Sequence, residues 1–195
     1  MPVEVITNPG RVNNTGGVLA GTSTQLTMPV ALDPNITQAT INALVPTVLP
    51  SGVAAASAPG VGACVELQTW NGATSGATGS PTFPTVALSS TTADFLLLGI
   101  ITGWQIADAG VTINTTKTVP TVVQVATAGD VVAVLTDHAS NITAGHVLTQ
   151  SAATAGLLTD GGTTWVAGKT VGVALTSLTI SSGIGLVFAK IGCVG

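Results

Sequence analysis

The chain has 195 residues, of which 46% are hydrophobic and only 6% are charged, and its formal net charge is −4. Its four cations are too few to neutralise a run of phosphates or to dock on anionic lipid, so we expect no nucleic-acid partner and no membrane binding. A disordered chain would need lower hydrophobicity and a higher net charge, and the many Val, Ile, Thr, Gly and Pro residues favour a β protein.

The sequence predicts an extended arm over residues 1–60, because seven prolines and several closely spaced glycines interrupt this stretch. At most one short helix is expected within the arm, with Asp33 as its N-cap, Pro34 at its first position and Pro46 after its end. Short apolar stretches such as residues 25–28 could pair with a strand of another chain. Alternatively, the arm folds back on its own domain, and the sequence leaves both arrangements open.

Residues 61–195 are predicted to form a small β-barrel or β-sandwich, so the expected fold class is mainly β. Short apolar runs alternate there with turns that contain Gly and Asp, at nearly even spacing. The sequence Asp160-Gly161-Gly162 is typical of a hairpin turn, and residues 71–84 read as a loop. Strands are expected at residues 61–70, 95–101, 111–115, 120–126, 131–136, 146–150, 157–159, 164–166, 171–175 and 184–191.

The two cysteines, Cys64 and Cys193, lie far apart in the sequence. The N-terminal stretch lacks a basic region followed by an apolar segment, so we expect no secretory signal. Without that context, separate reduced thiols that are buried as small apolar groups are the favoured interpretation. A disulfide between them is the alternative.

The titratable residues show no recognisable catalytic motif. His138 follows Asp137, and either His138 or His146 could in principle assist a serine or Cys64 as a nucleophile. However, the pattern G-x-S-x-G is absent, and neighbouring residues in a regular strand point to opposite faces, which would keep Asp137 from orienting His138. We therefore predict no catalytic residues and no enzymatic activity.

Metal binding is not predicted either. Zinc sites use Cys and His ligands at short spacings, and neither Cys64 nor Cys193 has such neighbours. Asp130, Asp137 and Asp160 lie in loops where oxygen ligands could hold Ca²⁺, but no 12-residue calcium-binding loop is present. We therefore expect no bound metal ion.

No cofactor site is expected from the glycines or the tryptophans. The glycine-rich pieces at residues 161–162 and 183–185 do not match a phosphate-binding loop, and turn formation explains them. Trp70, Trp104 and Trp165 are too widely spaced to propose a sugar-binding platform, so we interpret them as packing anchors.

The C-terminal part carries a recognisable order of short sequences. These are AGDVVAVLT at residues 128–136, NITAGHVLT at 141–149, AGLLTD at 155–160, VGVALTS at 171–177 and GLVFAKI at 185–191. Over residues 85–195 this order resembles the small β-barrel capsid decoration, or cement, proteins of tailed bacteriophages. The resemblance implies a protein on the outer capsid surface of the virion, made in the bacterial cytoplasm. It also implies a homotrimer that clamps neighbouring copies of the major capsid protein.

Clamping requires a large contact area rather than a reactive site, and an extended arm enlarges that area, especially by adding a strand to a neighbouring sheet. The arm therefore supplies the candidate contact residues with the capsid or with other subunits. They are Pro2, Val3, Val5, Ile6, Arg11, Leu26 and Met28.

Two other classes of function stay open. One is another structural component of the virion, such as a head fibre, a tail protein or a coat subunit. The other is a bacterial surface adhesin or carbohydrate-binding module, which would predict a secretion signal and exposed aromatic side chains.

Overall fold

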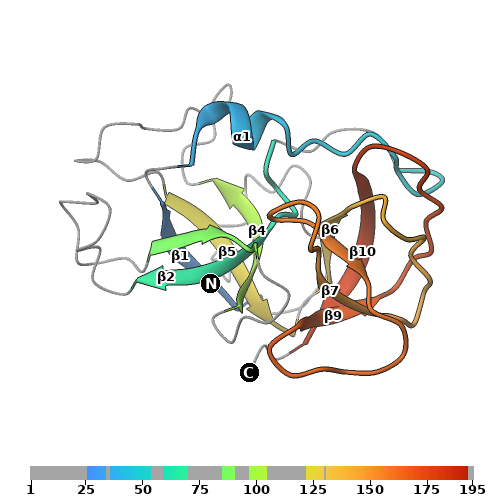
Figure 1. The fold of residues 1–195 in the computed structure, drawn as a ribbon. Coiled ribbons are helices and arrows are strands. Elements are labelled where there is room, and N and C mark those ends of the chain that lie inside the picture. The colour runs from blue at the N-terminus through green and yellow to red at the C-terminus, as the bar shows by residue number, and fades with distance from the viewer. Residues whose placement is uncertain are drawn as a thin grey trace, which may run out of the picture.

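The protein folds into two small closed β-barrels of five strands each, which lie side by side (Figure 1). This arrangement confirms the prediction of a mainly β protein with barrel architecture. The computed structural model describes residues 26–33, 36–53, 59–69, 85–90, 97–104, 122–129 and 131–192.

Barrel 1 is built from the first five strands, in the spatial order β1-β3-β2-β4-β5. Pairing of β1 with β5 closes the barrel, and the β1–β3 pair is parallel whereas its other pairs are antiparallel. Val30, Val65, Val86 and Val123 are fully buried in its interior, as stiff β-branched side chains in a pleated sheet should be. The strands are β1 Leu26–Leu32, β2 Cys64–Thr69, β3 Thr85–Leu88, β4 Leu97–Trp104 and β5 Val122–Ala128.

Barrel 2 is built from the last five strands, in the spatial order β10-β6-β8-β7-β9, and the β9–β10 pair closes it. Only the β6–β8 contact is parallel among its strand pairs, through Thr136 and Leu158. These five strands agree closely with the predicted ones. They are β6 Val131–Thr136, β7 Val147–Gln150, β8 Leu158–Asp160, β9 Thr170–Ala174 and β10 Gly185–Ile191.

Where the two barrels meet, side chains from each barrel pack into the core of the other. Leu135 of β6 belongs to the apolar core of barrel 1, whereas Cys64 and Ile100 of barrel 1 belong to the core of barrel 2. Gly62 connects them through the main chain, since its N–H donates to Ile101 and its C=O accepts from the N–H of Leu135. Its φ of +93° suits glycine, and a Cβ there would press on Leu135. The barrels therefore share one packed junction.

The described residues contain one short helix, as predicted, but it begins later than expected. The helix α1 covers Gln38–Asn42, and Thr37 is its N-cap, whose side chain accepts from the N–H of Thr40. The predicted N-cap, Asp33, is wrong because its N–H donates to Val86, which extends the pairing of β1 with β3.

The predicted boundary at residue 60, between an arm (1–60) and a single domain (61–195), does not coincide with an edge of either barrel. Strand β1 lies within barrel 1, so the arm folds back on its own domain over this stretch. After α1, the chain crosses to barrel 2, where Val48 pairs with Gly185 and hydrogen bonds join Val48 to Ile184 and Leu186. Residues 43–50 thus form a strap between the barrels (Figure 1).

Two predictions around residue 160 are wrong. Residues 164–166 form no strand, and Asp160-Gly161-Gly162 does not join two paired strands, because β8 pairs with β6 and β7 instead of β9. The glycines do turn the chain, but the turn returns to Val147, which accepts from the N–H of Gly161 and donates to the C=O of Gly162. The predicted loop at 71–84 and strand at 111–115 lie outside the described residues.

Candidate functional site

Strands β9 and β10 present an outward surface on barrel 2. Val187, Ala189 and Ile191 are buried in the barrel core, so the alternate residues Phe188 and Lys190 point outward. Lys190 pairs with Val173 of β9, which places these two side chains next to each other on the outside.

Leu175 continues this surface at the end of β9. Its N–H donates to the C=O of Phe188 at 2.7 Å, so the two side chains are cross-strand neighbours. Leu175 is 47% exposed, while Phe188 and Val173 are half-buried. The N–H of Phe188 in turn donates to the hydroxyl of Thr176 at 3.0 Å, which fixes this end of the strand pair.

Trp165 lies at the other end of the same surface. Its indole ring covers Gly192, where a Cβ atom would collide with the ring, and the N–H of Gly192 continues the sheet by donating to Val171. Trp165 is nevertheless 44% exposed, and its neighbour Val166 is 42% exposed. We call Trp165, Val166, Val173, Leu175, Phe188 and Lys190 the β9–β10 face.

The exposed ring corrects the interpretation of Trp165 as a packing anchor, because it packs with one edge and leaves much of its surface in solvent. Glycine at position 192 makes this possible by letting the ring approach the main chain. Trp70 lies outside the described residues, and Trp104 ends β4.

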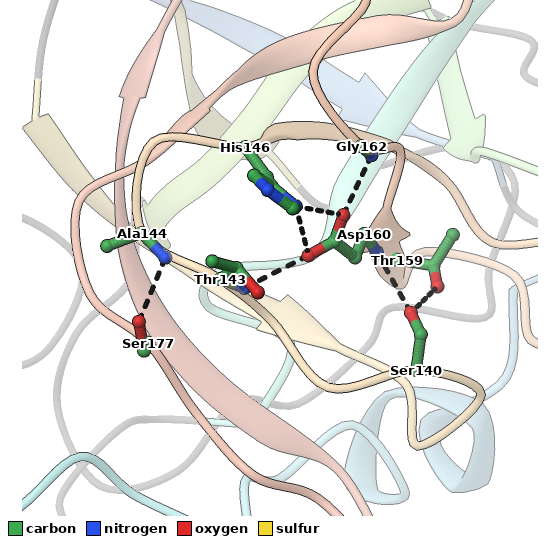
Figure 2. A network of polar contacts seen from close by, with 8 residues as sticks. All are labelled: Ser140, Thr143, Ala144, His146, Thr159, Asp160, Gly162 and Ser177. Carbon is green, nitrogen blue, oxygen red and sulfur yellow. Dashed lines mark hydrogen bonds and ion pairs between the residues drawn. The ribbon is translucent and has the colours of Figure 1, made fainter.

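The loop that carries Trp165 begins at Asp160, whose carboxylate is the centre of a polar network (Figure 2). Oδ1 of Asp160 accepts from the N–H of Gly162 at 2.7 Å, and Oδ2 accepts from the N–H of Thr143 at 3.0 Å. Nδ1 of His146 lies 2.9 Å from Oδ1 and 3.1 Å from Oδ2. Because an ionised carboxylate only accepts hydrogen bonds, Nδ1 carries the proton in this contact.

The pKa of Asp160 is lowered from its ordinary value. Burial alone would raise it, but the hydrogen bonds from Gly162, His146 and Thr143 stabilise the ionised form and outweigh burial. The ionised carboxylate of Asp160 therefore joins the start of the Trp165 loop to the turn before β7.

Further polar contacts join the neighbouring loops to the same network (Figure 2). The hydroxyl of Ser140 accepts from the N–H of Asp160 at 3.3 Å and contacts the hydroxyl of Thr159 at 2.9 Å. The N–H of Ala144 donates to the hydroxyl of Ser177 at 2.9 Å. Loops before β7 and before β10 are thereby connected.

The end of the Trp165 loop is also closed by hydrogen bonds. The hydroxyl of Thr170 accepts from the N–H of Val166 at 2.9 Å, and the C=O of Val166 accepts from the N–H groups of Lys169 and Thr170. Residues 161–169 therefore present Trp165 and Val166 from a loop that is held at both ends.

The pairing of Asp160 with His146 was not predicted from the sequence. Its only sequence signal was the position of both residues beside turns, and the register that pairs Leu148 with Asp160 places His146 on the same side. The predicted neighbours Asp137 and His138 do not meet in this way. Asp137 follows β6, is buried, and accepts from the N–H of Ala139 and from the hydroxyl of Ser151, while His138 is exposed.

Among the described residues, no three His, Cys, Asp or Glu side chains gather as a metal site would require. Asp137 and Asp160 use their oxygens for loop hydrogen bonds, and Asp130 lies outside the described residues. No helix in the described ranges has the length and apolar character of a membrane span.

Cys64 is a free, fully buried thiol, as predicted, and Cys193 lies outside the described residues. Burial raises the pKa of Cys64 to about 12, with a smaller raising effect from the nearby carboxylate of Glu66. The thiol is therefore protonated and unreactive at neutral pH.

The predicted contact residues of the arm divide into two groups. Leu26 pairs with Ala128 inside barrel 1, and the side chain of Met28 packs against the core of that barrel. Their contact with another subunit stays a prediction. The others, Pro2, Val3, Val5, Ile6 and Arg11, lie outside the described residues.

Neither a protein-family model nor a curated protein sequence matches this chain. The β9–β10 face combines two aromatic rings, three aliphatic side chains and one exposed cation.

Proposed function

We propose that this chain is a structural protein of a bacteriophage virion. It binds the outer surface of the capsid and stabilises the shell by clamping neighbouring copies of the major capsid protein. The observation that supports this proposal best is the β9–β10 face, where Trp165 and Leu175 are exposed at opposite ends of the outer surface of the β9–β10 pair and Val166 is exposed next to Trp165. In this proposal the protein acts by contact and not by catalysis.

The β9–β10 face has the properties of an interface centre. Tryptophan dominates the binding energy of many interfaces, above all when it is held in place before binding. Here the ring of Trp165 is held by Gly192, and its loop is closed by Asp160 and Thr170. Little conformational entropy is then lost when the face meets a partner.

Repetition makes such a face effective on a closed shell. Each copy contributes a modest net free energy, but linked copies bind with an avidity far above that of one contact. The resemblance to decoration proteins adds a homotrimer to the proposal, in which three β9–β10 faces engage the same region of the shell. Low charge fits this role, because 6% charged residues limit repulsion between crowded copies.

The exposed ring of Trp165 favours one second candidate function. Aromatic side chains offer a flat apolar face on which a sugar ring can pack. A carbohydrate-binding protein of the bacterial surface would use Trp165 in this way, and the same residue therefore serves to separate the two candidates.

The test is the binding of the purified chain to undecorated phage heads. We expect saturable, stoichiometric binding that raises the temperature at which the heads rupture. Trp165→Ala should weaken binding about 30-fold, as expected for the loss of an interface centre. Val45→Ala is the matched control, because Val45 is 37% exposed but lies on the strap, and its removal should leave binding unchanged.

Absence of saturable binding to heads would contradict the decoration proposal. Binding to a glycan array that is lost in Trp165→Ala and kept in Val45→Ala would support the carbohydrate-binding alternative.

A further inference from the structure

Two polar side chains lie inside barrel 2. Thr136 is fully buried and Gln150 is 2% exposed. They follow the core residues Val134 and Leu148 at a spacing of two along their strands, so both point into the barrel. Thr136 and Gln150 both pair with Leu158 of the central strand β8, which places the three side chains at one level.

Neither polar side chain has a partner among the described residues. The hydroxyl of Thr136 and both the oxygen and the nitrogen of the Gln150 amide form no hydrogen bond there. Buried amides and hydroxyls are rarely left in this state, because they lose their contacts with water and gain nothing in return. Two such groups at one level of the same barrel call for a shared partner.

We propose that barrel 2 binds an internal water molecule between Thr136 and Gln150. Because neighbouring strands lie about 4.8 Å apart, the Cα atoms of the two residues are separated by roughly 10 Å across β8. The side chain of Leu158 enters the core between them, so we place the water further toward the barrel axis, where the long Gln150 side chain can reach the side of Thr136. The water can accept from the Gln150 amide nitrogen and donate to its oxygen or to the Thr136 hydroxyl.

The surroundings of Thr136 shield its hydroxyl from solvent. Gly185 of β10 pairs with Thr136, and a Cβ atom there would lie only 2.6 Å from the Thr136 hydroxyl, so glycine is needed for the hydroxyl to take this position. The side chains of Leu178 and Ile180 lie against the same glycine. They shield the level from bulk solvent, and the bound water should therefore exchange slowly.

A shared water also fits the weakest strand contact of the barrel. Strands β6 and β8 meet through a single residue pair, Thr136 with Leu158, and Gln150 lies on the far side of β8. A water that bridges β6 to β7 would fix the position of both relative to β8. This role concerns the stability of barrel 2 and does not depend on the proposed function.

The direct test is NMR of the full chain labelled with ¹⁵N. We expect a cross-peak between a long-lived water and the side-chain amide protons of Gln150. The side-chain amide of the exposed residue Asn42 is the internal control, because water around it exchanges too fast to give the same signal. No long-lived water at Gln150 would overturn the proposal, whatever the behaviour of any variant.

Isosteric variants give a second test. If the water is bound, Thr136→Val and Gln150→Met should each lower the equilibrium constant for folding about tenfold, since each leaves the remaining group and the water underbonded. The double variant should lose much less than the product of the single losses, because the two residues share the water. Single variants that are more stable than the parent chain would instead show a dry interior and overturn the proposal.

Discussion

The two barrels have the same number of strands but reach closure in different ways. Barrel 2 uses one stretch of chain, residues 131–191, whose loops are held by side chains such as Asp160, Ser177 and Thr170. Barrel 1 gathers strands from residues 26 to 128, and its first strand β1 pairs with the distant strands β3 and β5. Each barrel has one parallel strand pair, and each core takes side chains from the other barrel. Contacts within one short stretch of chain therefore shape barrel 2, whereas pairing between distant segments shapes barrel 1.

The largest expected effect comes from Leu135→Ala, which removes a fully buried side chain from the junction of the barrels. We expect a loss of about 2–5 kcal/mol in the free energy of unfolding, as for other large-to-small changes in cores. Hydrogen exchange should show lower protection in β3 of barrel 1 as well as in β6 of barrel 2.

Two controls sharpen the Leu135 experiment. Leu148→Ala removes a buried leucine from the core of barrel 2, and Leu175→Ala removes an exposed one. Leu148→Ala should leave the protection of β3 nearly unchanged relative to its effect on β7, and Leu175→Ala should cost less than about 0.5 kcal/mol. Protection lost only in barrel 2 after Leu135→Ala would show that the barrels are independent.

Asp160→Asn should have the next largest effect, because the ionised carboxylate accepts from Gly162, Thr143 and His146. We expect a loss of about 1–3 kcal/mol at pH 7, measured by chemical denaturation. His138→Asn is the control at an exposed histidine of the same barrel, where stability should not change. An equal loss of stability in both variants would contradict the role of the Asp160 carboxylate in joining these loops.

The stability difference between the parent chain and Asp160→Asn should also depend on pH. The pKa of Asp160 is lower in the folded than in the unfolded chain, so its contribution is complete above the unfolded pKa near 4. It should then be lost as the pH falls through the folded pKa. A stability difference that stayed constant between pH 7 and pH 2 would rule out the ionised carboxylate as its source.

A smaller effect on stability is expected from Gly192→Ala, because the added Cβ atom would displace the Trp165 ring from its contact with the main chain at residue 192. The cost should be about 1 kcal/mol, whereas the tryptophan fluorescence should shift and binding to phage heads should weaken. Gly103→Ala is the matched control, because a Cβ there meets no atom within 4 Å. Unchanged binding by Gly192→Ala, together with a displaced ring, would remove Trp165 from the contact surface.

The smallest expected effect is in thiol labelling, because Cys64 should not react with thiol reagents in the native state at pH 8. Its thiol is fully buried at the junction, and burial raises its pKa to about 12. Mass spectrometry of the labelled peptide checks this. Labelling of Cys64 at a rate equal to that of the unfolded chain would show that the junction opens freely.

The same contrast explains how much of the fold could be predicted. The strands of barrel 2 were predicted well because glycines and aspartates mark their ends, as at Gly129, whose φ is +84°. The place of β1 in barrel 1 was not predicted, because its partners β3 and β5 are distant in sequence and no local signal selects them. The helix was predicted, but Asp33, its expected N-cap, instead pairs with Val86 of β3.

The candidate site was largely missed for the same reason. Residues 164–166 have the composition of a strand, but the turn at Gly161 and Gly162 uses Val147 as its hydrogen-bond partner and leaves them in a loop. The contact of Trp165 with Gly192 joins residues that are remote in sequence, and so does that of His146 with Asp160. Such contacts follow from the register of β7, β8 and β10, which composition does not encode.

The crossing of side chains at the junction has a practical consequence. A chain cut between β5 and β6 would give two halves, one lacking Leu135 and the other lacking Cys64 and Ile100. Each half would expose an unfinished apolar surface that only the other half can cover. The two fragments should therefore stay unfolded apart and assemble when mixed, which makes this protein a natural starting point for a split reporter.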